Sequence, residues 1–275
     1  MLEKGCEGNT HIEKESEWIL PENLRKSQEL ERKLVDNGTF NGSSDFGSYY
    51  AYLKGINYDF IKPHAISDDR IALEYAKNIS ALINKFNLKL SGNIIDIGCA
   101  IGTVTNALNI LNKDGKTYGL EISEDGIKAA INNYPDCNFL CQSADNLDNF
   151  QDEYFDVIHS KEFYGFTRTG DSSYHLKYLK LFHSKLKSKG FVILQMTSGD
   201  VLGLWSTYDN ITTELKNIGY ESVLKIKMIP SKIQKRLGGT AYNSAVYILL
   251  SYILKTVSLF KADKKLADVY ILIKK

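Results

Sequence analysis

The most informative stretch of the chain, residues 93–103, reads Asn-Ile-Ile-Asp-Ile-Gly-Cys-Ala-Ile-Gly-Thr. An apolar run containing Asp96 is followed by a short turn between Gly98 and Gly102, and a helix is expected to open at once. Gly98 allows the backbone to turn sharply, and Gly102 allows a ligand to approach the first turn of the helix. We therefore expect a buried strand, a glycine loop and a helix, with a nucleotide-bearing ligand at the carboxyl end of the strand.

Two ligand classes compete for this loop. A dinucleotide-binding G-x-G-x-x-G pattern counted from Gly98 needs glycines at 100 and 103, where the chain has Ala100 and Thr103. An acid two residues before the first glycine would also repel a pyrophosphate. The pattern acid-x-G-x-G-x-G fits better, because Asp96, Gly98 and Gly102 match it and only Ala100 replaces a glycine. An acid suits a ligand that carries an ammonium group and no phosphate.

Strand-like and helix-like segments alternate beyond this loop, which predicts an α/β fold with helices on both faces of a parallel sheet. Strands are expected at 93–97, 117–121, 137–141, 154–159, 191–196, 222–228 and 268–274. Helices are expected at about 21–34, after Ser67, and near 102–112, 123–133, 174–188 and 207–218. Gly190 is expected to end the helix at 174–188 before a buried strand.

Further landmarks follow in order. The second strand ends in Glu121, 25 positions after Asp96, and the third runs into Ser143, Ala144 and Asp145. With these landmarks the chain resembles, over about residues 90–225, the class I S-adenosylmethionine-dependent methyltransferases that act on small molecules. The resemblance implies a Rossmann-like, seven-stranded, mostly parallel sheet whose last strand is antiparallel. It also implies S-adenosyl-L-methionine as cofactor and S-adenosyl-L-homocysteine as product.

The resemblance assigns a cofactor site. Glu121 would accept hydrogen bonds from the ribose hydroxyls, and either Ser143 or Asp145 would contact the adenine. Tyr49 and Tyr50, with Phe46, would form a lid over the methionine end, or they only pack a cap helix. Cys99 is a small loop residue rather than a nucleophile, because transfer from a sulfonium needs no covalent intermediate. The expected cofactor-binding residues are Asp96, Gly98, Cys99, Ala100, Gly102, Glu121, Ile122, Ser143, Ala144, Asp145, Ser160, Tyr49 and Tyr50.

The acceptor is expected after the fourth strand, in residues 160–171, because such folds place chemistry there. Candidate catalytic residues are Glu162, His175 and Arg168, although ordinary solvated roles fit each of them equally well. Arg168 and a basic cluster (Lys225, Lys227, Lys232, Lys235 and Arg236) favour an anionic or sugar-like small-molecule acceptor methylated on oxygen. A hydroxyl acceptor would use Glu162 or His175 as general base. His159, within the fourth strand, is expected to be a core histidine with satisfied hydrogen bonds.

Two regions lie outside this pattern. Residues 1–90 are expected to form an N-terminal helical extension or cap, and residues 91–275 the methyltransferase domain. An insertion at about 229–266 interrupts that domain. Its apolar stretch, 241–260, is too interrupted to form a transmembrane segment. It could cover the acceptor site, pair two copies of the chain as a homodimer, or contact a membrane surface.

Composition excludes other classes. The chain has 34 basic and 33 acidic residues, so its net charge of +1 sets up no overall field for nucleic acid. Four cysteines without metal-ligand spacing predict neither a metal site nor disulfides, and Cys137 and Cys141 are expected to be buried. No signal-peptide pattern is seen, which predicts a cytoplasmic protein. An NAD-dependent oxidoreductase and a non-catalytic cofactor-binding protein are the alternative functions.

Overall fold

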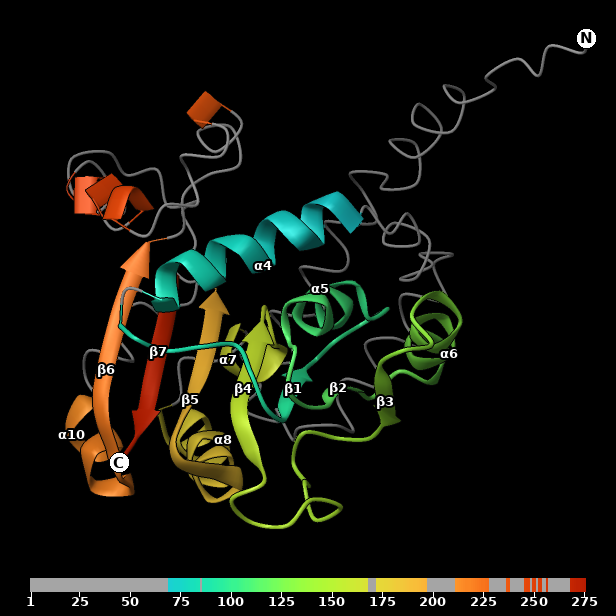
Figure 1. Cartoon of the computed structure of the whole chain (residues 1–275). Coiled ribbons are helices and arrows are strands. Elements are labelled where there is room, and N and C mark those ends of the chain that lie inside the picture. Colours follow the sequence, from blue (N-terminus) through green and yellow to red (C-terminus); the bar gives the residue numbers. More distant parts are fainter. Residues whose placement is uncertain are drawn as a thin grey trace, which may run out of the picture. The chain divides into compact units, whose positions relative to one another are not determined.

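The computed structural model describes residues 69–84, 86–167, 172–196, 211–227 and 268–275, together with 236–237, 245–247, 249–250, 252–253 and 256 (Figure 1). The chain divides into two compact units, Met1–Ser67 and Asp68–Lys275. All described helices and strands belong to the second unit, including the helix that follows Ser67. The expected helix at 21–34 lies outside the described residues.

A seven-stranded sheet forms the centre of the second unit, as predicted. Its strands are β1 (Ile94–Ile97), β2 (Thr117–Glu121), β3 (Asn138–Cys141), β4 (Phe155–Lys161), β5 (Leu186–Met196), β6 (Tyr220–Lys227) and β7 (Asp268–Lys274). The strand order is β3-β2-β1-β4-β5-β7-β6. Strands β1 to β5 are parallel, whereas β7 runs antiparallel to β5 and β6. The strand order reverses between β1 and β4, so their carboxyl ends border the crevice where ligands bind in such sheets.

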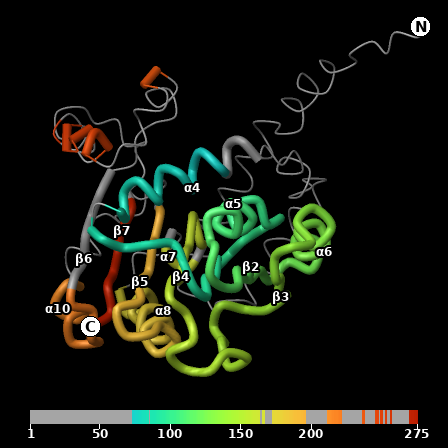
Figure 2. Tube along the Cα trace, in the orientation of Figure 1, coloured from blue at the N-terminus to red at the C-terminus, as the bar shows by residue number. Residues whose placement is uncertain are grey.

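Helices cover both faces of the sheet, as Figures 1 and 2 show. They are α4 (Asp69–Asn84), α5 (Thr103–Leu111), α6 (Glu124–Asn133), the short α7 (Tyr164–Thr167), α8 (Ser172–Lys185) and α10 (Thr212–Ile218). One face packs under α4 and α5, where Ile79, Leu82 and Leu108 meet Ile94 and Val157. The opposite face packs against α8 and α10 through a second core, which includes Tyr178, Phe182, Leu215, Ile158 and Val192.

The boundary between α8 and β5 corrects one prediction. We expected a helix to Ser188 that Gly190 would end, but α8 ends at Lys185 and β5 already begins at Leu186. Gly190 lies inside the strand, where a Cβ atom would come within 3.0 Å of the Asp156 carbonyl oxygen. The pairing of β4 and β5 shifts register nearby, between Phe155 and Val157. Gly190 therefore permits close approach of two strands rather than ending a helix.

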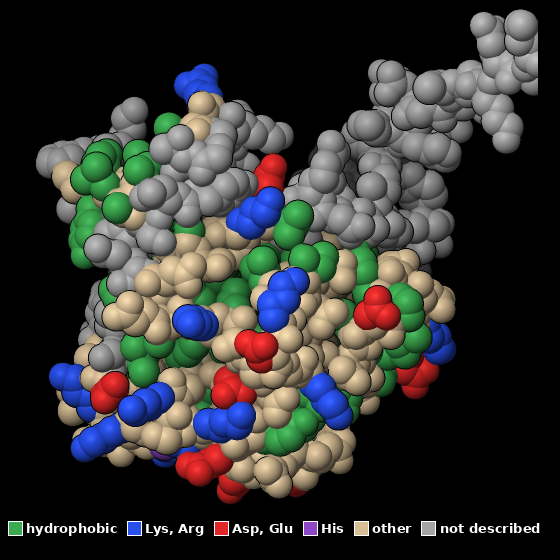
Figure 3. All heavy atoms as spheres, in the orientation of Figure 1, with side chains coloured by type: hydrophobic (Ala, Val, Ile, Leu, Met, Phe, Trp, Pro, Cys, Tyr) green, Lys and Arg blue, Asp and Glu red, His purple; other side chains and the backbone are tan. Residues whose placement is uncertain are grey.

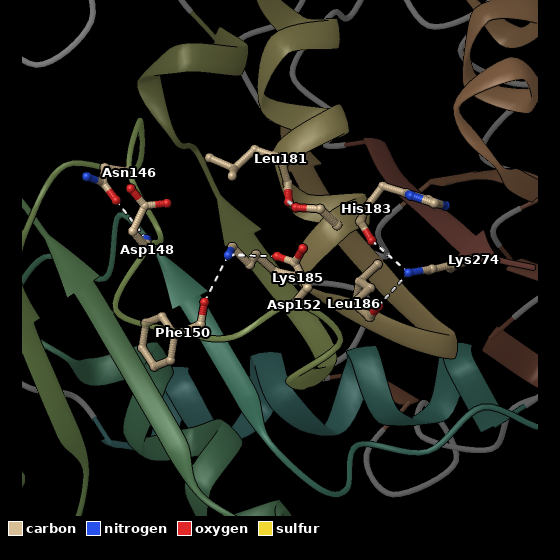
Figure 4. A network of polar contacts seen from close by, with 10 residues as sticks. Asn146, Asp148, Phe150, Asp152, Leu181, His183, Lys185, Leu186 and Lys274 are labelled. Carbon is tan, nitrogen blue, oxygen red and sulfur yellow. Dashed lines mark hydrogen bonds and ion pairs between the residues drawn. The ribbon is translucent and has the colours of Figure 1, made fainter.

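Two buried lysines, Lys185 and Lys274, connect segments around the junction of α8 and β5 (Figure 4). The Lys274 amine donates to the carbonyl oxygens of Leu186 at 2.7 Å and His183 at 3.0 Å, and pairs with Glu153 at 3.2 Å. The Lys185 amine donates to the Phe150 carbonyl at 2.9 Å. The Lys274 amine therefore satisfies backbone carbonyls where α8 passes into β5 and ties β7 to that junction, whereas the Lys185 amine ties the end of α8 to the segment between β3 and β4.

Strand β3 and the insertion bear on two further expectations. Cys141 was wrongly expected to be buried: it is exposed, because β3 is the edge strand of the sheet. In the insertion, the described residues between 245 and 256 are helical, and Tyr247 is fully buried in the core under α4. No helix among the described residues is long and apolar enough to cross a membrane.

Candidate functional site

The loop between β1 and α5 is built from left-handed backbone. Gly98, Ala100 and Gly102 have φ values of +75°, +51° and +83°. The Gly98 and Cys99 amides donate to the Leu120 carbonyl at 2.8 and 3.0 Å, which joins the loop to β2. Ala100, in place of the middle glycine, adopts the left-handed conformation despite the steric cost of its Cβ atom. The expected strand, glycine loop and helix are all present.

Glu121 connects this loop to the end of β2. Its Oε2 atom accepts a hydrogen bond from the Ala100 amide at 3.1 Å. Its Oε1 atom accepts from the amides of Ile122 at 2.8 Å and Ser123 at 3.1 Å. Burial raises the pKa of Glu121, although these backbone hydrogen bonds oppose the shift. A carboxylate has about four acceptor positions, so Oε2 keeps room for a hydroxyl donor. A contact between Glu121 and the ribose of the cofactor stays a prediction.

Asp96 lies in a buried network that the sequence did not predict. Its Oδ2 atom accepts from the Thr105 hydroxyl at 2.8 Å, and its Oδ1 atom lies 2.7 Å from His159 Nδ1. The other ring nitrogen of His159 lies 2.7 Å from the Tyr75 hydroxyl. His159 is fully buried with both nitrogens bonded, so its expected role as a satisfied core histidine is confirmed. A direct contact between Asp96 and the cofactor stays a prediction.

Asp96 sets the direction of these hydrogen bonds. A carboxylate oxygen only accepts, so His159 Nδ1 donates to Asp96 Oδ1. In a neutral imidazole Nε2 then accepts from the Tyr75 hydroxyl. Burial, followed by the nearby Asp96 carboxylate, holds the pKa of Tyr75 well above its ordinary value, so the phenol keeps the proton that it donates. The network joins α4, β4, β1 and α5. Tyr75 lies in the helix that was expected after Ser67, but the sequence gave no signal for its hydrogen bond.

The loop after β3 holds the candidate adenine contacts. The Ser143 hydroxyl donates to Asp145 Oδ2 at 3.0 Å and accepts from the Asp145 amide at 3.1 Å. The other oxygen of Asp145 pairs with Lys177 on α8 at 3.0 Å. Partial burial acts to raise the pKa of Asp145, but hydrogen bonds from Lys177, Tyr178 and Ser143 outweigh it and lower the pKa. Both candidates lie in one turn, beside the buried Ala144.

Other predicted cofactor residues surround the same edge of the sheet. Ser160 is buried in β4 and paired with Ile97 of β1. Cys99 is buried, and that burial raises the pKa of its thiol well above the ordinary range. The thiol therefore stays protonated, as expected of a residue that is not a nucleophile. Tyr49 and Tyr50 lie outside the described residues, as does Phe46.

The acceptor side is partly described. Glu162 follows β4 directly, is partly exposed and has a φ of +55°. His175 on α8 is fully buried, with its ring edge-to-face against Phe166 at 5.4 Å. Arg168 lies outside the described residues. A general base must reach the acceptor; Glu162 is partly exposed, whereas His175 is fully buried, and the catalytic role of both stays a prediction.

Metal ligation is not a feature of the described residues, which contain no group of three or more His, Cys, Asp or Glu side chains placed to hold an ion.

The central part of the chain matches a known protein family. A family described as a methyltransferase domain matches residues 88–234, more than half of the chain. Protein 235L of Invertebrate iridescent virus 6, whose name carries a methyltransferase assignment, is 31% identical over 76 residues. That match covers 28% of each chain, so it spans only a small part of the viral protein.

Solved structures with a similar fold are more distant in sequence. One is phosphoethanolamine N-methyltransferase 2 of Haemonchus contortus in complex with S-adenosyl-L-methionine, with 15% identity and a TM-score of 0.48. It is matched over 82% of this chain but only 59% of its own length. A chain from the Haloferax volcanii complex of the Trm112 methyltransferase activator has 13% identity and a TM-score of 0.50, over 76% of this chain and 95% of that one. At these identities the similarity concerns the fold alone.

Proposed function

This chain belongs to the methyltransferase-domain family, and from that membership we propose that it transfers a methyl group from S-adenosyl-L-methionine to an oxygen of a small acceptor. S-adenosyl-L-homocysteine is the second product. The observation that carries the proposal is the contact between Glu121 and the Ala100 amide, since it brings a buried carboxylate with acceptor capacity against the glycine loop. This position is compatible with the ribose contact that the resemblance implies for Glu121.

The cofactor supplies an electrophilic methyl group on a sulfonium. The chain has to bind and orient it: Glu121 accepts from the ribose hydroxyls, and Ser143 or Asp145 contacts the adenine. Asp96 bonds to Thr105 in α5, the helix that follows the glycine loop, and to His159 in β4. Tyr49 and Tyr50 are proposed to close over the methionine end. Alignment of the acceptor oxygen, the methyl carbon and the sulfur then provides most of the rate enhancement, at best about 7–11 kcal/mol.

Glu162 and Arg168 are proposed to act on the acceptor. As an oxygen–carbon bond forms and the carbon–sulfur bond breaks, a hydroxyl acceptor must lose its proton, and Glu162 can accept it. Arg168 would hold an anionic group of the acceptor through its two-pronged guanidinium. His175 is the alternative base. The same base could serve a protonated amine or an acidic carbon, so identification of the labelled product distinguishes methylation of oxygen from methylation of nitrogen or carbon.

Three broader proposals accompany this function: a role in small-molecule biosynthesis, a cytoplasmic location, and a homodimer through residues 241–260. In that segment Leu249 and Tyr252 expose 61% and 65% of their surface, which is high for apolar side chains and supports a partner. Light scattering of the purified chain tests the dimer: a monomer at working concentration contradicts it.

The test of the proposed function begins with the ligand carried through purification, identified by mass spectrometry. S-adenosylmethionine or S-adenosylhomocysteine is expected. Methyl-labelled S-adenosylmethionine is then incubated with the protein and a metabolite extract, and a labelled product with stoichiometric S-adenosylhomocysteine is expected. Tight binding of NAD without S-adenosylmethionine would indicate the oxidoreductase alternative. Cofactor binding with no product from any extract would indicate a non-catalytic protein.

A further inference from the structure

Lys161 is the last residue of β4, at the carboxyl end of a central strand. Because side chains alternate along a strand, Lys161 shares a sheet face with His159. Its amine lies 4.9 Å from the centre of the Tyr75 ring. The Tyr75–His159–Asp96 network fixes that ring, so it holds the amine next to the proposed methyl-transfer site.

The Lys161 amine differs from four other described lysines in or near the sheet. Lys177, Lys185, Lys187 and Lys274 each pair with a carboxylate at 3.2 Å or less. Lys161 has neither an ion pair nor a hydrogen bond to any residue that the structure describes. Burial lowers its pKa, while the Glu162 and Asp96 carboxylates act in the opposite direction. Burial of an ammonium group without a paired anion costs free energy. An anionic ligand would offset that cost.

Gln195 provides a second polar group beside Lys161. The two residues are direct partners in the parallel pairing of β4 and β5, so their side chains leave the sheet on the same face. Gln195 is only 6% exposed, and its Oε1 atom has no hydrogen-bond partner in the described part of the chain. A buried amide atom without a partner is unfavourable unless a ligand or water satisfies it.

From these observations we infer that Lys161 binds an anionic group of the acceptor, a carboxylate or a phosphate, while Gln195 hydrogen-bonds to the acceptor beside it. Lys161 thereby selects acceptors of negative charge. The inference rests on the proposed methyl transfer and adds a residue that determines its substrate class. The group bound by Lys161 is not the nucleophile, so the methylated product keeps its negative charge.

The first experiment measures occupancy of the site without knowing the acceptor. The purified full chain with S-adenosylhomocysteine is treated with an amine-acetylating ester, and acetylation of each lysine is followed by peptide mass spectrometry. Acetate and inorganic phosphate are the two probes, one for each anion class. We expect one of them to slow acetylation of Lys161 several-fold and to leave Lys128, exposed on α6, unchanged. Equal rates at Lys161 with and without both probes would overturn the inference.

The second experiment uses variants in the labelled-extract assay. Lys161→Met should lower product formation roughly 10- to 100-fold, as expected for loss of a charge-assisted hydrogen bond. Lys161→Arg should recover most of that loss. Lys187→Met, which removes a half-buried lysine at the opposite end of the sheet, serves as the control. The wild-type product should be retained on an anion-exchange resin.

Cofactor affinity separates the possible failures. Calorimetry should show that Lys161→Met binds S-adenosylmethionine within about twofold of the wild type, because Lys161 lies on the acceptor side. If the wild type itself does not bind S-adenosylmethionine, the proposed function fails. If the wild type binds and transfers while Lys161→Met is equally active, or if the product is neutral, only the anionic site fails. If Lys161→Met does not fold, Lys161→Arg and the acetylation experiment still test whether Lys161 binds an anionic group.

Discussion

Gly102 combines a left-handed backbone with close packing. A Cβ atom at this position would lie 2.6 Å from the Phe139 ring, and φ is +83°. Gly102→Ala should therefore destabilise the fold by about 2–4 kcal/mol, from backbone strain and overpacking together. Urea denaturation measures the loss. In a Phe139→Leu background the smaller side chain relieves the overpacking, so the same substitution should cost less. Equal costs in both backgrounds would show that Phe139 is not the obstacle.

Glu121 is the residue on which cofactor binding depends most. Glu121→Gln keeps the size of the side chain but loses its charge and half of its acceptor capacity. We expect affinity for S-adenosylmethionine, measured by calorimetry, to fall roughly 10- to 100-fold. Glu124→Gln is the control, because that carboxylate is 77% exposed on α6. Unchanged affinity in Glu121→Gln would mean that Glu121 only braces the glycine loop through Ala100.

Among the elements, β7 depends on Lys274 for its attachment to the end of α8. Lys274→Ala removes the donor to the His183 and Leu186 carbonyls, which lie in a buried region. A loss of about 2–3 kcal/mol in unfolding free energy is expected. Lys275→Ala, one residue further and exposed, should change stability by less than about 0.5 kcal/mol. A similar, small effect of both substitutions would contradict the role assigned to Lys274.

The helices and strands also show which structural features the sequence could not predict. Strand β2 and the glycine loop could be predicted, because alternation of elements and local turn chemistry are visible in the chain. The end of α8 could not, since Gly190 serves a close approach of β4 that depends on their pairing. The hydrogen bond from Tyr75 to His159 joins residues 84 positions apart, and no local pattern encodes it. From the sequence Lys161 is one of several basic residues that could position an anionic acceptor, and only the Tyr75 ring and Gln195 beside it distinguish it from the others.

At the scale of the whole molecule, the net charge is only +1. Basic and acidic side chains are interspersed among the described residues on the face shown in Figure 3. We therefore expect local groups, such as Lys161, and not an overall field of the chain, to attract an anionic acceptor.

Ligand binding should stabilise this unit as a whole, because the cofactor site joins the glycine loop, β2 and the loop after β3, which exist together only in the folded state. At 100 times its dissociation constant, S-adenosylmethionine should add about 2.7 kcal/mol to the unfolding free energy. For a chain of this size that corresponds to a rise in Tm of roughly 5–10 °C, measured by calorimetric scanning. Lys161→Met should retain the rise, and Glu121→Gln should lose about half of it or more at the same ligand concentration, in keeping with its roughly 10- to 100-fold weaker binding. NAD at equal concentration should leave Tm unchanged; a rise with NAD and none with S-adenosylmethionine would refute the assignment of the site.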